Sequence, residues 1–296
     1  MSGGCERGEV TLRNGDLAVR VSRHGGAITF AEYRATPFLV ASGGPDRTMA
    51  SFPLVPFGNR VAGNAMSFDG RDYRFRPNSP GPLYLHGDGW LALWEVEGEE
   101  PQCVRLGFSR IADDVSPYSY QARQEIGISG NTLVLDLSVT NRGEAALPFG
   151  LGHHPFFPRT PKTRLTAGAQ VFWSERDGHL PDERRAVPDT LRFADGKTLP
   201  RQWVNNAFEG WKGQASITWP EFGLQVVLDA DAVFSSYMIY MPIERPDFFC
   251  FEPMSHLPDG HHMQDLGGLT VLAPGESLSG RVSIRLSPLA TEFGES

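Results

Sequence analysis

The chain has 296 residues, of which 40% are apolar and 21% are charged, a composition typical of a globular protein and not of a disordered or fibrous one. Its formal net charge of −8 argues against a nucleic-acid-binding surface, because such a surface needs clustered lysine and arginine. The 33 glycines and 23 prolines are spread along the whole chain and leave little room for long helices.

Targeting signals are not readable in this sequence. The first ten residues contain no apolar segment of the kind found in secretory signals, and no later stretch approaches the ~20 apolar residues of a membrane-spanning helix. The three cysteines, Cys5, Cys103 and Cys250, are odd in number and far apart, so they indicate neither a disulfide framework nor a CxxC metal clip. We therefore expect a protein of the reducing cytoplasm with no membrane partner.

Alternation of apolar and polar residues predicts many short strands. Asn14-Gly15 and Asp69-Gly70 are dipeptides typical of tight hairpin turns, and Leu133, Leu135 and Leu137 alternate with smaller or polar residues. No window of about 12 residues shows the spacing of an amphipathic helix. The strands that we expect lie within residues 18–22, 65–68, 73–75, 118–128, 132–140, 223–229, 234–240, 248–252, 269–272 and 278–286.

Many short strands separated by Gly/Pro turns favour an all-β sandwich or barrel. The chain shows no internal repeat and no low-complexity linker, so we expect one large domain spanning residues 1–296. Residues 181–198 are the most polar stretch, and we predict a long loop there and not a domain boundary.

Two charged residues stand beside strongly apolar segments. Glu252 follows the run Phe248-Phe249-Cys250-Phe251, where an unpartnered carboxylate would be costly to desolvate. It is either half of a buried ion pair with an arginine or a general base tuned by its surroundings. Arg60 ends the apolar run of residues 52–59 and either pairs with a carboxylate or points its donors into a cleft.

Three other segments combine polar and aromatic residues. His86 precedes Trp90 and is either a structural histidine or part of a pocket. His153 and His154 are adjacent on an extended segment, so they face opposite ways and at most one enters a given pocket. Asn205 either contacts a sugar hydroxyl or belongs to a plain turn.

Taken together, these segments resemble the aldose 1-epimerases (galactose mutarotases) and related sugar mutarotases. The likeness runs from about residue 25 to residue 286 and is carried by several motifs in the family's order. These motifs are Gly25-Gly26-Ala27-Ile28, Phe57-Gly58-Asn59-Arg60-Val61, Leu85-His86-Gly87 with Trp90 and Trp94, His154-Pro155-Phe156-Phe157, Asn205-Asn206-Ala207-Phe208-Glu209-Gly210-Trp211, Tyr240-Met241-Pro242, Phe249-Cys250-Phe251-Glu252-Pro253-Met254-Ser255-His256 and Leu272-Ala273-Pro274-Gly275-Glu276-Ser277.

The resemblance implies a large antiparallel β-sandwich, a sugar substrate in an open cleft and no cofactor. It implies that Glu252 is the general base and His154 the general acid, with His86 and Arg60 near the sugar. Asn205 stands where the family usually carries a sugar-binding aspartate. An amide loses the charge-assisted hydrogen bond of a carboxylate, so we expect Asn205→Asp to lower KM for at least one aldose.

Three alternatives to a mutarotase of free aldoses stay open. A sugar-phosphate mutarotase would need cations at the cleft rim, for which Arg71, Arg74 and Arg76 are candidates. A catalytically silent sugar-binding protein would have no need of both Glu252 and His154. A metal-dependent β-barrel enzyme would need converging ligands, and the spacing of the available histidines predicts no metal site. Those histidines are His153, His154, His256, His261 and His262.

Overall fold

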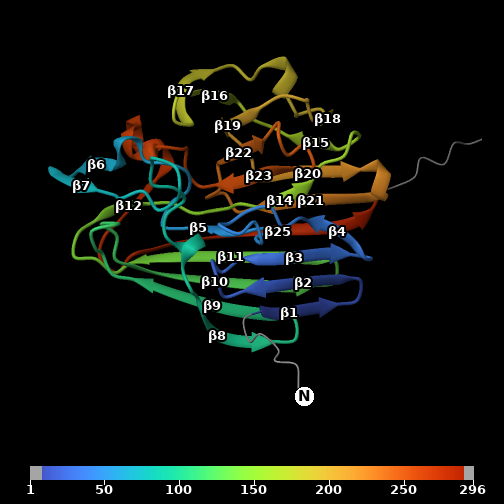
Figure 1. The fold of residues 1–296 in the computed structure, drawn as a ribbon, viewed down its shortest axis with the longest axis horizontal. Helices are drawn as coiled ribbons and strands as arrows, with labels where there is room; N and C mark the ends of the chain where they lie inside the picture. Colours follow the sequence, from blue (N-terminus) through green and yellow to red (C-terminus); the bar gives the residue numbers. More distant parts are fainter. Residues whose placement is uncertain (1–8, 290–296) are drawn as a thin grey trace, which may run out of the picture.

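The structure, a computed structural model, describes residues 9–289, which form antiparallel sheets joined by turns (Figure 1). This confirms the all-β sandwich that apolar alternation and the family resemblance predicted. Within that range the helical elements are short 3₁₀ segments, as the Gly and Pro content led us to expect. They are η1 (Ala62–Asn64), η2 (Gly89–Leu91), η3 (Asp189–Leu191), η4 (Pro220–Phe222), η5 (Gly260–His262) and η6 (Gln264–Gly268).

The largest sheet has nine strands in the order β18-β15-β20-β21-β25-β11-β10-β9-β8. In β11, Leu133, Leu135, Leu137 and Val139 are buried, and the residues between them are half-buried. This alternation sends all four apolar side chains to one face of the strand. The strands are β8 (Glu95–Glu100), β9 (Cys103–Arg110), β10 (Tyr120–Ser129), β11 (Thr132–Asn141), β15 (Arg164–Ala167), β18 (Lys197–Thr198), β20 (Gln214–Trp219), β21 (Leu224–Ala230) and β25 (Ser277–Pro288).

A second sheet of eight strands has the order β17-β16-β19-β22-β23-β13-β5, and β14 also pairs with β23. Its central strand β23 is buried along its whole length. The strands are β5 (Pro53–Leu54), β13 (Gly152–His153), β14 (Phe156–Pro158), β16 (Val171–Arg176), β17 (Leu180–Arg185), β19 (Val204–Glu209), β22 (Ser236–Met241) and β23 (Phe248–Met254).

Smaller sheets complete the fold. Gly15 (φ 55°) turns the hairpin between the first two strands, and Asp69 and Gly70 (φ 50° and 71°) turn a second hairpin, both where the dipeptides predicted them. The smaller sheets contain β1 (Glu9–Asn14), β2 (Leu17–Ser22), β3 (Ile28–Tyr33) and β4 (Thr36–Leu39) in one, β6 (Ala65–Phe68) and β7 (Arg71–Arg74) in another, and β12 (Leu147–Phe149) and β24 (Thr270–Leu272) in a third.

The two faces of β23 belong to different apolar clusters. Phe249 and Phe251 pack in the main core together with the buried leucines of β11. Phe248 and Cys250 pack in a second, smaller cluster. Since side chains alternate along a strand, Glu252 leaves β23 on the side of this second cluster. A carboxylate is thereby held within apolar surroundings on the face of the sheet that points away from the main core.

The prediction of a long loop over residues 181–198 is wrong for its first part, because β17 runs from Leu180 to Arg185. From Asp182 onward this strand carries exposed charged residues, and it pairs only with β16 at the edge of the sheet. A strand with no buried face has no apolar alternation, so the pattern that revealed the central strands is missing here.

The structure tests the expectations about disulfides and membrane-spanning helices only for residues 9–289. Cys103 and Cys250 are free thiols, and Cys5 lies outside the described residues. Between residues 9 and 289, no helix combines the length and apolar character that crossing a membrane requires.

Candidate active site

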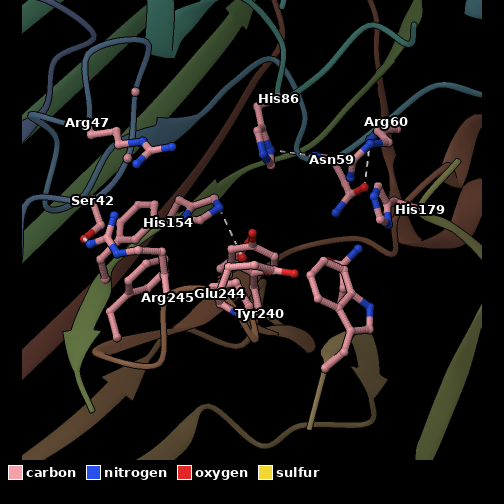
Figure 2. A pocket seen from close by; sticks show the side chains of 18 residues that line it. Ser42, Arg47, Asn59, Arg60, His86, His154, His179, Tyr240, Glu244 and Arg245 are labelled. Carbon is pink, nitrogen blue, oxygen red and sulfur yellow. Dashed lines mark hydrogen bonds and ion pairs between the residues drawn. The ribbon is translucent and has the colours of Figure 1, made fainter. Parts of the chain in front are cut away.

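A cleft of about 430 Å³ opens on the face of the eight-stranded sheet that carries Glu252. All five residues singled out from the sequence, Arg60, His86, His154, Asn205 and Glu252, line this cleft. Figure 2 labels Arg60, His86 and His154 among them. They come from distant parts of the chain, and the sheet brings them together. Pockets of this size, with a few convergent polar groups, are typical of small-molecule sites.

Glu252 and His154 form a buried pair in the cleft. Nε2 of His154 lies 3.2 Å from Oε1 of Glu252, and the side chains are only 9% and 3% exposed. The imidazole packs against two rings, with centroid distances of 4.6 Å to Phe52 and 4.7 Å to Phe156, and these two rings also contact each other. This aromatic packing holds the imidazole in the cleft with its Nε2 beside Glu252.

Burial favours the uncharged form of each member of this pair. Desolvation raises the pKa of Glu252 above its ordinary value, and the nearby Arg60 cation acts in the opposite direction. Desolvation also lowers the pKa of His154, and the Arg60 cation lowers it further. Within residues 9–289, Glu252 forms no ion pair with an arginine. The ion-pair explanation for this carboxylate is therefore wrong, which leaves a carboxyl tuned by burial.

The imidazole of His86 is uncharged and can donate a hydrogen bond into the cleft. The backbone N–H of Asn59 donates to Nδ1 of His86 over 3.1 Å. Burial, with the neighbouring His154 and Arg60, holds the pKa of His86 well below its ordinary value. A neutral imidazole that accepts at Nδ1 carries its hydrogen on Nε2, so His86 offers a hydrogen-bond donor.

Arg60 follows a residue in the left-handed region, Asn59 (φ 62°), a conformation that asparagine tolerates better than most residues. The backbone N–H of Arg60 donates to Oδ1 of Asn59 over 2.9 Å. Burial lowers the pKa of the guanidinium, whereas the carboxylates of Glu175 and Glu252 raise it. Arg60 thus keeps its donors for the cleft and adds a positive charge beside the catalytic candidates.

The other histidines considered as metal ligands lie elsewhere. His153 is 1% exposed and packs near Phe234, as expected for the ring opposite to His154. His256 accepts from the backbone N–H of Gly58, and His261 contacts the Tyr118 hydroxyl. No two of the proposed histidines converge on the cleft among its lining residues.

A different trio has ligand atoms close together, namely His154, Cys250 and Glu252, all within 4.8 Å of one another. Burial and the Glu252 carboxylate hold the pKa of the Cys250 thiol well above its ordinary value. A metal ion would have to displace the proton of this thiol, which lies among apolar side chains.

Among the lining residues that the sequence did not single out as site residues are Trp203, Tyr240 and His179. Trp203 lies just before β19, and Tyr240 lies on β22 opposite Asn205, so both are on the same face as the predicted site. His179 lies at the turn between β16 and β17 and is missed because that hairpin has no apolar alternation. The only trace of it in the sequence is the Asp177-Gly178 turn signal that precedes His179.

The arginines proposed for a sugar phosphate are not at this cleft. Arg71 and Arg74 belong to the hairpin strand β7, Arg76 is ion-paired with Asp114, and none of the three lines the cleft. The arginines at its rim are Arg47 and Arg245 instead.

The chain matches the model of the aldose 1-epimerase family over residues 8–285. It belongs to the aldose 1-epimerase family. A curated relative from Escherichia coli strain K12, the uncharacterized protein YphB, is 40% identical in an alignment over 288 residues that covers 93% of this chain and 98% of the relative.

Solved structures of aldose 1-epimerase-like proteins have the same fold. A crystal structure of a putative aldose 1-epimerase from E. coli K12 superposes with a TM-score of 0.91 at 40% identity, covering 95% of this chain and 99% of the other. A galactose mutarotase-like protein from Clostridium acetobutylicum superposes with a TM-score of 0.84 at 16% identity and covers 95% of each chain. At that identity the second likeness concerns the fold alone.

Proposed function

We propose that this member of the aldose 1-epimerase family is a cofactor-independent mutarotase that interconverts the α and β anomers of a free aldose. The observation that carries the proposal is the buried contact of 3.2 Å between Nε2 of His154 and Oε1 of Glu252 in a polar cleft. Ring opening of a sugar needs one group that removes a proton and one that delivers a proton, and this pair supplies both.

Glu252 removes the proton from the C1 hydroxyl while His154 delivers a proton to the ring oxygen. The bond between C1 and the ring oxygen breaks as the C1 carbonyl forms, and the open aldehyde rotates about C1–C2. The same steps in reverse close the ring on the other face. Arg60, His86 and Asn205 hold the hydroxyls during the rotation, since each lines the cleft.

The proton count of the pair fits this cycle. Before ring opening the pair is Glu252 carboxylate with His154 imidazolium, and afterwards it is Glu252 carboxylic acid with neutral His154. The two arrangements hold the same number of protons and the same net charge. Burial favours the uncharged arrangement. The Arg60 cation favours the Glu252 carboxylate and disfavours the His154 imidazolium, so it lowers the pKa of both groups.

The raised pKa of Glu252 predicts how activity depends on pH. The reactive arrangement holds one proton more than Glu252 carboxylate with neutral His154, so kcat/KM should fall as the pH rises through the raised pKa of Glu252, where the pair loses the proton that His154 must deliver. Arg60→Met removes a cation that lowers this pKa, so the alkaline limb should move to higher pH, whereas Arg60→Lys should keep it near the wild-type position. A pH profile measured on both variants tests this, and an alkaline limb that Arg60→Met leaves in place or moves to lower pH would contradict it.

The proposed function is tested by NMR exchange spectroscopy on D-glucose, D-galactose, D-mannose and D-glucose 6-phosphate, with protein before and after treatment with a chelator. We expect exchange between the anomers of at least one free aldose and no loss of rate with chelator. Loss that a divalent metal restores would favour a metal site at His154, Cys250 and Glu252 instead.

A sugar-phosphate substrate is the second candidate, and one observation favours it. Arg47 is exposed at the cleft rim and forms no ion pair with another residue in the described range. Arg245 at the same rim is already bound to Asp247, with an Nε–Oδ1 distance of 2.9 Å. Faster exchange of D-glucose 6-phosphate than of D-glucose, lost in Arg47→Gln, would support this candidate.

A further inference from the structure

Glu175, which does not itself line the cleft, is the common acceptor for three side chains that do. It accepts hydrogen bonds from Nδ1 of His179 over 2.6 Å, from Nε1 of Trp203 over 2.7 Å and from Nδ2 of Asn205 over 2.7 Å. His179 and Asn205 share Oε1, and Trp203 takes Oε2. One end of the cleft is therefore organised around a single carboxylate (Figure 2 shows His179 at that end).

Local backbone features bring these four residues together. The pairing of β16 with β17 shifts register between Trp173 and Glu175, and such an irregularity re-aims a side chain. His179 adopts a left-handed conformation (φ 60°) at the turn that follows. Trp203 and Asn205 are two residues apart in extended chain, so their side chains leave on the same side. Asn205 lies inside β19, which rules out the plain turn considered from the sequence.

These contacts fix which atoms face a ligand. A carboxylate only accepts hydrogen bonds, so Asn205 must turn its Nδ2 toward Glu175. Its Oδ1 then has no hydrogen-bond partner among residues 9–289 and is left to accept from a ligand. His179 must likewise carry a hydrogen on Nδ1, and its neutral form accepts at Nε2. With the Trp203 N–H occupied as well, this wall of the cleft offers acceptors and an aromatic surface.

We propose that Glu175 is a positioning residue that locks Asn205, and His179 in its neutral form, as hydrogen-bond acceptors, so that this end of the cleft takes an uncharged sugar hydroxyl and not a phosphate or carboxylate group. An anionic substituent has only acceptors and would meet acceptors here. The proposal rests on the proposed function, because it names how that site selects its substrate.

The contact between Asn205 and Glu175 reverses the expectation for Asn205→Asp. A carboxylate at position 205 would face the Glu175 carboxylate where the wild type has an N–H···O bond of 2.7 Å. The single substitution should therefore raise KM for the aldose and not lower it. Glu175→Gln should also raise KM, since its amide releases Asn205 and His179 from their fixed orientation.

Combining both substitutions restores a donor and an acceptor with their roles exchanged. In Asn205→Asp/Glu175→Gln, the new amide donates to the new carboxylate, which keeps an oxygen facing the cleft, and the amide oxygen still accepts from Trp203. His179 then accepts at Nδ1 by changing its tautomer, so its Nε2 donates to the cleft and only the acceptor at position 205 is restored. We expect about tenfold higher KM in each single variant, the equivalent of one ordinary hydrogen bond, and a KM in the double variant that is below that of either single variant. The kcat should change little, because the contact exists in ground and transition states alike.

The experiment measures KM and kcat by anomer exchange for the aldose of the panel that the wild type exchanges fastest, together with the rise in Tm that the same aldose causes. Glu183→Gln is the matched control, since Glu183 is exposed on the same hairpin and pairs with Arg185. Three results would overturn the positioning role. They are a KM in the double variant raised by the product of the two single effects, an unchanged KM in the single variants, and a loss confined to kcat. If the wild type exchanges no anomers, the proposed function fails separately, and the rise in Tm that D-glucose, D-galactose or D-mannose causes in the same five proteins still decides the role of Glu175.

Discussion

Glu252→Gln should reduce the rate of anomer exchange by about 10²- to 10⁴-fold, the usual cost of losing a general base. The amide has the size of the carboxyl group but cannot take the proton from the C1 hydroxyl. Because Arg60, His86 and Asn205 are untouched, KM should change far less than kcat. Activity within a few-fold of wild type would remove Glu252 from the mechanism.

The same variant should not lose stability. Desolvation raises the pKa of Glu252, which means that the folded protein resists its ionisation. The uncharged amide escapes this cost, so the Tm of Glu252→Gln should equal or exceed that of wild type. The difference should grow as the pH rises through the raised pKa, since only the ionised carboxylate is penalised. A large drop in Tm would mean that the loss of activity reports unfolding and not chemistry.

His154→Asn should be nearly as damaging as Glu252→Gln, with a loss of about 10²- to 10⁴-fold in kcat, because the ring oxygen loses its proton donor. The neighbouring His153→Asn is the matched control. Its ring is 1% exposed and lies on the other side of the extended segment, away from the cleft. We expect His153→Asn to keep a kcat close to that of wild type per folded molecule, even if it lowers Tm.

Kinetics on both variants, normalised to the folded fraction from circular dichroism, decide between the two histidines. The reverse ranking, with His153→Asn inactive and His154→Asn active, would mean that the wrong residue of the pair has been assigned as the acid.

The central strands and the main site residues were predictable because each left a physical trace in the sequence. Alternating leucines mark the buried face of β11, and a carboxyl group among phenylalanines marks Glu252. The adjacent histidines also followed from geometry, since an extended chain sends His153 and His154 to opposite sides. The family resemblance then put these residues into one cleft, which the periodicity alone did not do.

The Glu175 network could not be predicted in the same way. Its carboxylate lies on an edge hairpin whose exposed residues show no apolar period. Two of its three partners, Trp203 and Asn205, follow about 30 residues later at the start of β19. Only the pairing of β16 with β19 brings the two segments together. The rim arginines were misplaced for a similar reason, because Arg47 and Arg245 lie in loops whose path depends on the tertiary fold.

The most direct measurement is the exchange between the two anomers of a free aldose at equilibrium, recorded by NMR with wild-type protein and with Glu252→Gln at equal concentration. A general acid/base mutarotase predicts that wild type accelerates exchange of D-glucose, D-galactose or D-mannose far above the buffer rate and that Glu252→Gln returns it close to that rate. If wild type binds an aldose, as seen from a rise in Tm, yet leaves the exchange at the buffer rate, the protein is a silent sugar-binding member of the family and the proposed acid/base mechanism is contradicted.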